Sequence, residues 1–381
     1  MIQEAVIIAY GRAPIGKAKK GSLAQEHPVD FAGQVLQGVM NKVPQLGAEM
    51  VSDVIVGCAK PEKQQGQNIA RLIAQRSGFP DSVCGQTVNR FCASGLQAIA
   101  TASNSITVGQ ASVLAAGGVE SMTAIPMGFA EEYHCGWLQE NIPDLYAGMG
   151  ITAENVAQAY NVSRQEMDSF AVESHSKAFQ AQEAGLFNRE IIPITTSGGT
   201  VFTMDEGIRP GSTMEVLGQL KPSFLEGGMV TAGNSSQTSD SAAFVLLSAR
   251  DKAEALGIKP IARMVGFAVG GVPAGIMGVG PMVAIPEVMQ QTGLSLDDMD
   301  VIELNEAFAA QAIACIRQLN IDPAKVNPRG GAIAMGHPLG ATGAILTCKA
   351  LSYLEDTDGR YALVSMCIGG GMGAAGIFER L

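Results

Sequence analysis

An approximate internal repeat constrains the fold of this chain more than any other feature of its sequence. The triplet DVI at 53–55 recurs at 300–302, 247 positions later. The triplet ASG at 93–95 is matched by ATG at 341–343, 248 positions later, and each opens a stretch with helical periodicity. Short motifs also coincide by chance, but two nearly equal offsets predict duplicated halves of about 120 residues.

Apolar runs alternate with helix-like stretches in both halves, which is typical of α/β proteins. The expected strands are 4–9, 53–57 and 112–116 in the first half and 261–267, 301–304 and 361–367 in the second.

A middle segment belongs to neither half. It is rich in turn residues and holds one amphipathic helix, Arg164–Ala184, with Ser163 as the expected N-cap. We therefore expect an N-terminal domain at 1–260 and a C-terminal domain at 261–381. The N-terminal domain would consist of a core half (1–120 and 234–260) and an inserted loop domain (121–233).

Charge and composition argue against several classes of protein. The net charge is −11 and no basic stripe is present, so the chain is a poor candidate for binding nucleic acid. No apolar run reaches the ~18 residues that a membrane span needs. The seven cysteines lack framework spacing and the N-terminus lacks a basic leader, so we expect a cytoplasmic protein. Metal motifs such as H-E-x-x-H and C-x-x-C are missing, and we expect no metal.

Cys92 is the first candidate for chemistry. In VNRFCASG (88–95) a short strand is expected to lead through Cys92 directly into a helix. Unpaired N–H groups at a helix N-terminus stabilise a thiolate and lower its pKa, and the same amides can donate to an oxyanion. The sequence thus predicts a nucleophile, with a small buried hydrophobic residue as the alternative.

Three further residues stand in unusual surroundings. His337, one of four histidines, lies in the glycine-rich run 330–343, where another group can approach its ring closely. Cys367 ends a β-run beside three glycines, so that either substrate reaches it or it is a core cysteine. Asn305 follows the apolar run 301–304, where it could line a ligand crevice or cap the next helix.

Together these motifs resemble the thiolase family. The matching segments are NRFCASG (89–95), GGVESM (117–122), TAGNSSQTSD (231–240), NEAFAAQ (305–311), GGAIAMGHPLGATG (330–343) and CIGGGMG (367–373). They occur in the family's order and span nearly the whole chain. The resemblance implies a thiolase fold, in which two duplicated α/β halves stack in an αβαβα layered core with an inserted loop domain.

The resemblance also implies a reaction, the thiolytic cleavage of 3-ketoacyl-CoA by CoA to acetyl-CoA and a shortened acyl-CoA. Cys92 would attack the keto carbon and form an acyl-enzyme, and His337 would take the thiol proton. Cys367 would protonate the departing enolate, or remove the α-proton in the synthetic direction. One oxyanion site would use His337 and a water held by Asn305, and the other the backbone N–H groups of Cys92 and Gly369.

The family's substrate contacts carry over onto matching positions. Coenzyme A would be a co-substrate bound on the inserted domain, with no permanently bound cofactor. Arg209, in IRPG, would stack on or pair with its nucleotide end, and Ser236 would contact the pantetheine. The other positions are Phe224, Ala232 and Phe308 along the pantetheine path and Met149 beside the acyl pocket. Gly148 stands where acetoacetyl-CoA thiolases have a histidine beside CoA.

The subtype rests on smaller differences. Pro338-Leu339 and the short stretch between GGVESM and ITAEN favour a degradative thiolase of fatty-acid β-oxidation. Acetoacetyl-CoA thiolase (acetyl-CoA C-acetyltransferase) remains an alternative. A non-catalytic acyl-CoA-binding subunit would not need two cysteines and a histidine together. The resemblance further implies a homodimer or a dimer of dimers, and it leaves open a hydratase/dehydrogenase subunit as partner.

Overall fold

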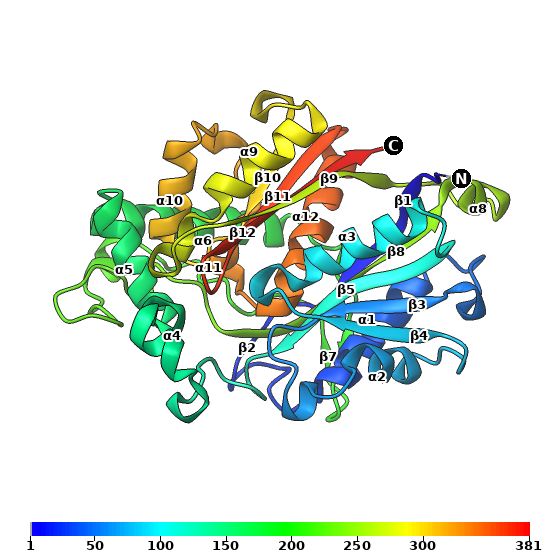
Figure 1. Cartoon of the computed structure of the whole chain (residues 1–381), viewed down its shortest axis with the longest axis horizontal. Coiled ribbons are helices and arrows are strands. Elements are labelled where there is room, and N and C mark those ends of the chain that lie inside the picture. The colour runs from blue at the N-terminus through cyan, green and yellow to red at the C-terminus, as the bar shows by residue number, and fades with distance from the viewer. Residues whose placement is uncertain (1) are drawn as a thin grey trace.

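Two groups of strands with the same internal order form the centre of the structure, a computed structural model that describes residues 2–381 (Figure 1). The strands of the first group are β1 (Ala5–Arg12), β3 (Asp53–Gly57), β4 (Cys84–Val88), β5 (Val113–Ser121) and β8 (Ser239–Ala249), with the short β2 (Gly16–Lys17) beside β8. Those of the second are β9 (Ala262–Gly271), β10 (Val301–Leu304), β11 (Tyr361–Ile368) and β12 (Met372–Arg380). All six strands expected from the sequence are present, and four of them extend further than predicted.

Strand order and direction repeat between the groups. The first reads β4-β3-β5-β8-β1 and the second β10-β11-β12-β9, so that β3, β5, β8 and β1 correspond to β10, β11, β12 and β9. In each group the first of these four strands is parallel to the second, and the other contacts among the four are antiparallel. Strand β4 is parallel to β3. The groups join edge to edge where β1 meets β9, at Ile7 and Ala262. This shared topology supports the duplication read from the sequence.

Helices complete five layers. The first half contributes α1 (Pro28–Met40), α2 (Ile69–Arg76), α3 (Ser94–Thr107) and α8 (Arg250–Ala255), and the second contributes α9 (Pro281–Thr292), α10 (Ala309–Gln318), α11 (Ala332–Met335) and α12 (Thr342–Thr357). Helices α3 and α12 share one apolar core between the two strand groups. Helices α1 and α2 cover the outer face of the first group, and α9 and α10 that of the second (Figure 1). The αβαβα prediction is therefore confirmed.

The glycines of the repeated triplets explain how the two central helices pack. A Cβ at Gly95 would lie 2.8 Å from the backbone nitrogen of Ala344, and one at Gly343 would lie 2.4 Å from that of Leu96. Because these distances are shorter than van der Waals contact, any larger residue would push α3 and α12 apart. The triplets ASG and ATG thus mark a place where the two halves approach each other closely.

The segment between β5 and β8 places its helices beside the layered core and packs its two short strands against α1 (Figure 1). It contains α4 (Gly136–Asn141), α5 (Met149–Ala159), α6 (Arg164–Glu183), β6 (Ile194–Thr195), β7 (Val201–Phe202) and α7 (Met214–Gly218). The predicted amphipathic helix is α6, and Ser163 caps it in a capping box with Glu166. Buried Arg12 of β1 binds Glu190 at 2.7 Å and Asp205 at 2.8 Å, which fixes this segment to the core.

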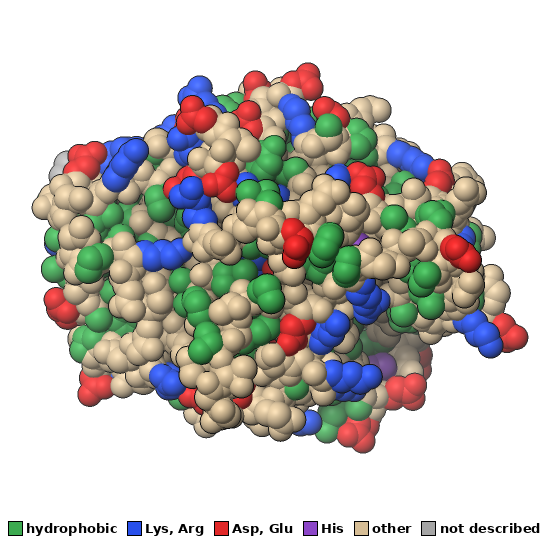
Figure 2. All heavy atoms as spheres, turned by 180° about the vertical axis from the view of Figure 1, so that it is seen from behind, with side chains coloured by type: hydrophobic (Ala, Val, Ile, Leu, Met, Phe, Trp, Pro, Cys, Tyr) green, Lys and Arg blue, Asp and Glu red, His purple; other side chains and the backbone are tan. Residues whose placement is uncertain are grey.

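On the face opposite to that of Figure 1, several basic side chains gather beside a hollow, while acidic and basic groups are scattered elsewhere (Figure 2). None of the helices within residues 2–381 has the length and hydrophobicity that crossing a membrane requires.

Candidate active site

Cys92 lies in a strained turn. It is the middle residue of η3 (Phe91–Ala93), a single 3-10 turn that leads directly into α3. Phe91 has a φ of +44°, a left-handed conformation that costs a bulky residue about 1–3 kcal/mol. Two hydrogen bonds hold it there: its N–H donates to Asn89 Oδ1 at 2.9 Å, and its carbonyl accepts from Ser94 Oγ at 2.6 Å. The strain is therefore supported by the surrounding turn.

The fold brings the other candidate residues to this turn. η3 packs against β11, which carries Cys367, and against η9 (Leu339–Ala341), which follows His337. The backbone N–H of Gly369 donates a hydrogen bond to the Cys92 thiol, which lowers the pKa of that thiol. Burial raises the pKa of Cys367, and a charge on Cys92 raises it further. The fold thus brings Cys92 of the first half together with three residues of the second half, His337, Cys367 and Gly369.

The expectation of a lowered Cys92 pKa is wrong. Burial, with a smaller contribution from the carboxyl of Glu120, raises the pKa of Cys92 to about 12 against the lowering effect of the hydrogen bond from Gly369. The thiol precedes α3 by two positions, and the loss of solvation around it outweighs the donors at the helix end. Burial likewise raises the pKa of Cys367 well above its ordinary value. Both thiols are neutral in the free protein, so a base is needed.

His337 can supply that base. Its ring is buried, and burial lowers its pKa to about 4, so the imidazole is neutral. The Thr342 hydroxyl donates to the Pro338 carbonyl at 3.0 Å, and its oxygen lies 2.6 Å from His337 Nδ1. Because the hydroxyl has only one proton, this network assigns the ring proton to Nδ1. Nε2 is then left with its lone pair, as an acceptor for a proton.

Asn305 faces the same nitrogen. It is fully buried, and its Nδ2 lies 3.4 Å from His337 Nε2. Its Oδ1 has no hydrogen-bond partner among residues 2–381, so one polar atom remains available for another group. The helix-cap alternative is wrong, because α10 begins at Ala309 and Gln311 accepts a hydrogen bond from Phe308 N–H there.

Glu120 has a part in this site that sequence reasoning missed. Its Oε2 accepts hydrogen bonds from the N–H groups of Ala59 and Gly340, both at 2.8 Å, and its Oε1 accepts one from Gln65 at 2.7 Å. It therefore fixes the turn η9 that follows His337. The signal was available, because Glu120 is the one ionisable residue in the apolar strand 113–121.

Contacts link several of the positions expected to contact CoA to one another and to Gly369. The Arg209 guanidinium donates to Gln237 Oε1 at 3.1 Å. The backbone N–H of Ser236, the residue before Gln237, donates to the Ala307 carbonyl at 3.0 Å. Phe308 packs edge-on against Phe224, with the ring centroids 6.0 Å apart. The ring of Phe224 also packs directly on Gly150. The side chains of Met149 and Phe91 both lie next to Gly369. Arg209, Phe224 and Ala232 are exposed, whereas Phe308 is buried.

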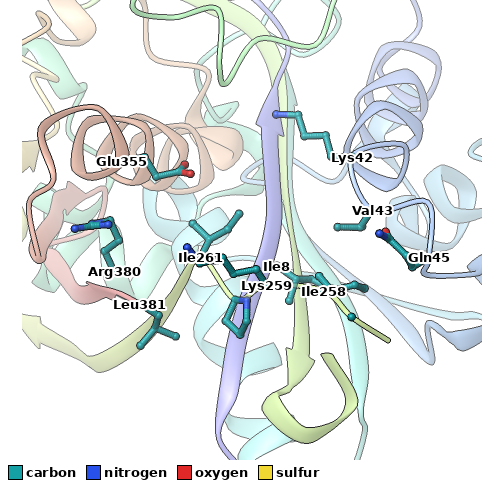
Figure 3. A pocket seen from close by; sticks show the side chains of 12 residues that line it. Ile8, Lys42, Val43, Gln45, Ile258, Lys259, Ile261, Glu355, Arg380 and Leu381 are labelled. Atoms are coloured by element: carbon teal, nitrogen blue, oxygen red, sulfur yellow. The ribbon is translucent and has the colours of Figure 1, made fainter. Parts of the chain in front are cut away.

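A cavity elsewhere does not contain these residues. It has a volume of about 310 Å³ and lies where the two halves meet, lined by Ile8, Lys42, Ile258, Ile261, Glu355 and Arg380 among others (Figure 3). Its Lys42 ammonium is already bonded to the carbonyls of Tyr10 and Arg189, both at 2.8 Å. Within residues 2–381 no three His, Cys, Asp or Glu side chains are grouped as metal ligands.

We expect the buried His337 to make the stability of the protein depend on pH. Its pKa of about 4 is below the ordinary value of 6.5, so between these values the unfolded chain binds more protons than the folded one. The free energy of unfolding therefore loses a contribution of about 3 kcal/mol as the pH falls from 7 to 4. Urea unfolding at both pH values should show a smaller loss for His337→Gln than for the wild type. Exposed His27 gives the control, His27→Gln, and equal losses in all three proteins would contradict the assignment.

Comparison with known proteins agrees with this geometry. The thiolase N-terminal domain family matches residues 5–251, and the thiolase C-terminal domain family matches residues 258–380. The 3-ketoacyl-CoA thiolase of Bacillus subtilis (strain 168) is 47% identical, over 99% of this chain and 100% of that one. The peroxisomal 3-ketoacyl-CoA thiolase A of Mus musculus is 44% identical, over 98% of this chain and 90% of that one.

Solved structures give the same result. The dimeric peroxisomal thiolase of Saccharomyces cerevisiae superposes with a TM-score of 0.93 at 41% identity and covers 100% of this chain and 98% of its own. The acetyl-CoA acetyltransferase of Bacillus anthracis also superposes with a TM-score of 0.93, at 38% identity, over 100% of this chain and 99% of its own. From the two family matches and the full-length relatives, the chain belongs to the thiolase family.

Proposed function

We propose that the chain is a 3-ketoacyl-CoA thiolase, an acyltransferase of fatty-acid β-oxidation. It would cleave 3-ketoacyl-CoA with CoA to acetyl-CoA and an acyl-CoA shortened by two carbons. The convergence of Cys92, His337 and Cys367 in one site carries this proposal. Full-length identity of 47% to a protein named 3-ketoacyl-CoA thiolase supports it.

In the first half-reaction Cys92 is the nucleophile and His337 the base. The sulfur bonds to the keto carbon while Nε2 takes the thiol proton. The raised pKa of Cys92 and the lowered pKa of His337 disfavour a stable ion pair at rest, so proton transfer accompanies the attack. The Cα–Cβ bond then breaks, and its electron pair forms the acetyl-CoA enolate. Cys367 gives its proton to the enolate carbon and becomes a thiolate, leaving an acyl group on Cys92.

In the second half-reaction a CoA thiol replaces the acetyl-CoA. The Cys367 thiolate takes the proton of that thiol, and the CoA sulfur attacks the acyl carbon. Cys92 leaves, and the proton held by His337 returns to it. Every group is then in its starting form, which is what a ping-pong cycle requires.

Two sets of donors would stabilise the oxyanions. Once His337 Nε2 has taken a proton, it becomes a donor beside Asn305, whose free Oδ1 can hold a water. The backbone N–H groups of Cys92 and Gly369 would form the other set, which the hydrogen bond from Gly369 to the thiol supports. Fixed donors of this kind need no rearrangement when charge develops, and each is worth about a hundredfold or more in rate.

We further propose that CoA lies on the segment between β5 and β8. Arg209 would bind its nucleotide end and Ser236 its pantetheine, with Phe224, Ala232, Phe308 and Met149 along the path to Cys92. The exposure of Arg209 and the contacts that link it inward to Gly369 support this direction. We also propose that the chain divides into domains at 1–260 and 261–381, with 121–233 as an insertion in the first.

Arg209→Ala should raise the KM for CoA about tenfold and lower kcat less than twofold, because it removes binding energy far from the reacting atoms. Steady-state thiolysis at varied CoA concentration measures both constants. Arg76→Ala, which removes an exposed arginine of α2 paired with Asp30 of α1, is the control and should leave both constants unchanged. An unchanged KM for the Arg209 variant would refute the proposed nucleotide site.

The function itself is tested by CoA-dependent cleavage of 3-ketoacyl-CoA substrates that range from four to sixteen carbons. Rates that hold or rise with chain length are expected. Activity at four carbons alone would move the assignment to acetoacetyl-CoA thiolase, an alternative that the similarity to an acetyl-CoA acetyltransferase keeps open. No activity at any length, with CoA still bound, would favour the non-catalytic acyl-CoA-binding subunit.

We propose that the protein works as a homodimer or a dimer of dimers in a reducing compartment such as the cytoplasm. Strand β4 pairs only with β3 within the described chain, and an unpaired sheet edge favours association with a second copy. The yeast relative is described as dimeric. All seven cysteines are free, which fits a reducing compartment. Sedimentation of the protein alone and with a hydratase/dehydrogenase subunit tests its oligomeric state and that partner.

A further inference from the structure

One half-buried glutamine connects three segments around the candidate active site. Gln237 Oε1 accepts a hydrogen bond from the Arg209 guanidinium at 3.1 Å. Its Nε2 donates to the Gly207 carbonyl at 2.9 Å, to that of Ala334 at 3.0 Å and to that of Ile333 at 3.2 Å. The same side chain therefore contacts both the loop that carries Arg209 and the helix α11 that leads to His337.

The backbone of the same residue completes the connection. The Gln237 carbonyl accepts a hydrogen bond from the His337 N–H at 3.0 Å and another from Ser239 Oγ at 2.9 Å. Gln237 thus binds the backbone amide of His337, while Thr342 and Asn305 contact its ring. The arginine loop is held from its other side, because the Arg209 N–H donates to His175 Nδ1 at 3.1 Å.

We propose that Gln237 is a positioning residue that connects the CoA-binding loop at Arg209 to the catalytic base His337. The inference rests on the proposed function and deepens it. Gln237 itself does not touch the reacting atoms. It keeps the segment that precedes His337 at a fixed distance from the arginine loop, so that CoA binding and base placement share one support.

The chemistry of an amide explains why glutamine suits this position. The guanidinium offers only donors and the three carbonyls offer only acceptors, so the connecting side chain must accept at one end and donate at the other. Glutamate would keep the acceptor for Arg209 but lose the donors to the carbonyls at 207, 333 and 334. Alanine would lose both. The two substitutions therefore separate the two halves of the connection.

The experiment measures kcat and the KM for CoA in thiolysis of acetoacetyl-CoA and a longer 3-ketoacyl-CoA. Gln237→Glu should lower kcat about tenfold and leave the KM for CoA within about twofold, because the contact to the Arg209 guanidinium is kept while those to the carbonyls of Gly207, Ile333 and Ala334 are lost. Gln237→Ala should lower kcat by a similar factor and also raise the KM several-fold. In the Gln237→Ala background, Arg209→Ala should raise the KM less than it does in the wild type.

A matched control separates positioning from stability. Gln34 of α1 is also half-buried, and its amide bonds both the N–H and the carbonyl of Thr195, far from the site. Gln34→Ala should lower the melting temperature about as much as Gln237→Ala but leave kcat and KM unchanged. If Gln237→Glu does not fold, Gln237→Met serves in its place, with loss of both contacts and the result expected for alanine.

The outcomes distinguish the two proposals. A wild type that cleaves no 3-ketoacyl-CoA overturns the proposed function, and this inference with it. An active wild type whose Gln237→Glu variant keeps its kcat overturns the inference alone. So does a Gln34→Ala variant that loses as much kcat as the Gln237 variants.

Discussion

Cys92→Ser should lower kcat for thiolysis by about a thousandfold or more and abolish the acyl-enzyme. A hydroxyl is a much weaker acid than a thiol, and burial already raises the pKa of the thiol to about 12 at this position. His337, whose pKa is lowered to about 4, is too weak a base to activate a serine in the same surroundings. The substitution is nearly isosteric, so the turn at Phe91 should keep its shape.

Mass spectrometry after incubation with acyl-CoA should find the acyl group on the wild type and not on the variant. Calorimetric titration should show CoA binding to both, because the proposed CoA contacts lie on other residues. Cys135→Ser, at an exposed position before α4, is the control and should keep full activity. Near-normal turnover by Cys92→Ser would remove Cys92 as nucleophile and leave the site without its central residue.

Cys367→Ala should still be acylated but should lose exchange of the α-protons of acetyl-CoA by about a hundredfold or more. The acylation step uses Cys92 and His337, whereas exchange needs a base at the α-carbon. Cys367 suits that task because it is buried close to Cys92, and its raised pKa makes its thiolate a strong base. Thiolysis should fall with exchange, since the enolate then lacks a proton donor.

Deuterium uptake into acetyl-CoA in heavy water, followed by NMR, measures the exchange. Cys348→Ala is the matched control, because Cys348 is also fully buried and burial raises its pKa to about 12. It lies in α12 and leaves a cavity of the same size, so a stability effect should appear in both variants. Exchange that persists at the wild-type rate in Cys367→Ala would assign the proton transfer to another group.

The fold could be predicted well from the sequence, and for a physical reason. Offsets of 247 and 248 residues pointed to duplication, and both matched pairs mark structural constraints. The segments 53–55 and 300–302 lie in the corresponding strands β3 and β10. Gly95 and Gly343 lie where each central helix comes too close to the other for any side chain. At these positions the local sequence pattern and the tertiary packing favour the same structure. The pattern was therefore sufficient to predict the fold.

Electrostatics at the site could not be predicted in the same way. The helix N-terminus suggested a low pKa for Cys92, but burial reverses the direction. How much water a side chain loses depends on segments that are remote in sequence, and the Gly369 donor and the Glu120 carboxyl come from two such segments. Gln237 lies within TAGNSSQTSD, yet nothing in the local sequence shows that its side chain bonds residues 207, 209, 333 and 334.

By itself the sequence determined the duplicated α/β architecture, the identities of the residues that can act as nucleophile, base and acid, and the resemblance to thiolases. The architecture follows from periodicity and turn chemistry, which are local properties of a chain, and the roles of the three residues follow from the resemblance. Only the tertiary structure decided which nitrogen of His337 carries the proton, which way the thiol pKa values shift, and that Asn305 faces the imidazole instead of capping α10. Those properties depend on distance and desolvation between groups brought together from both halves, and folding alone sets them.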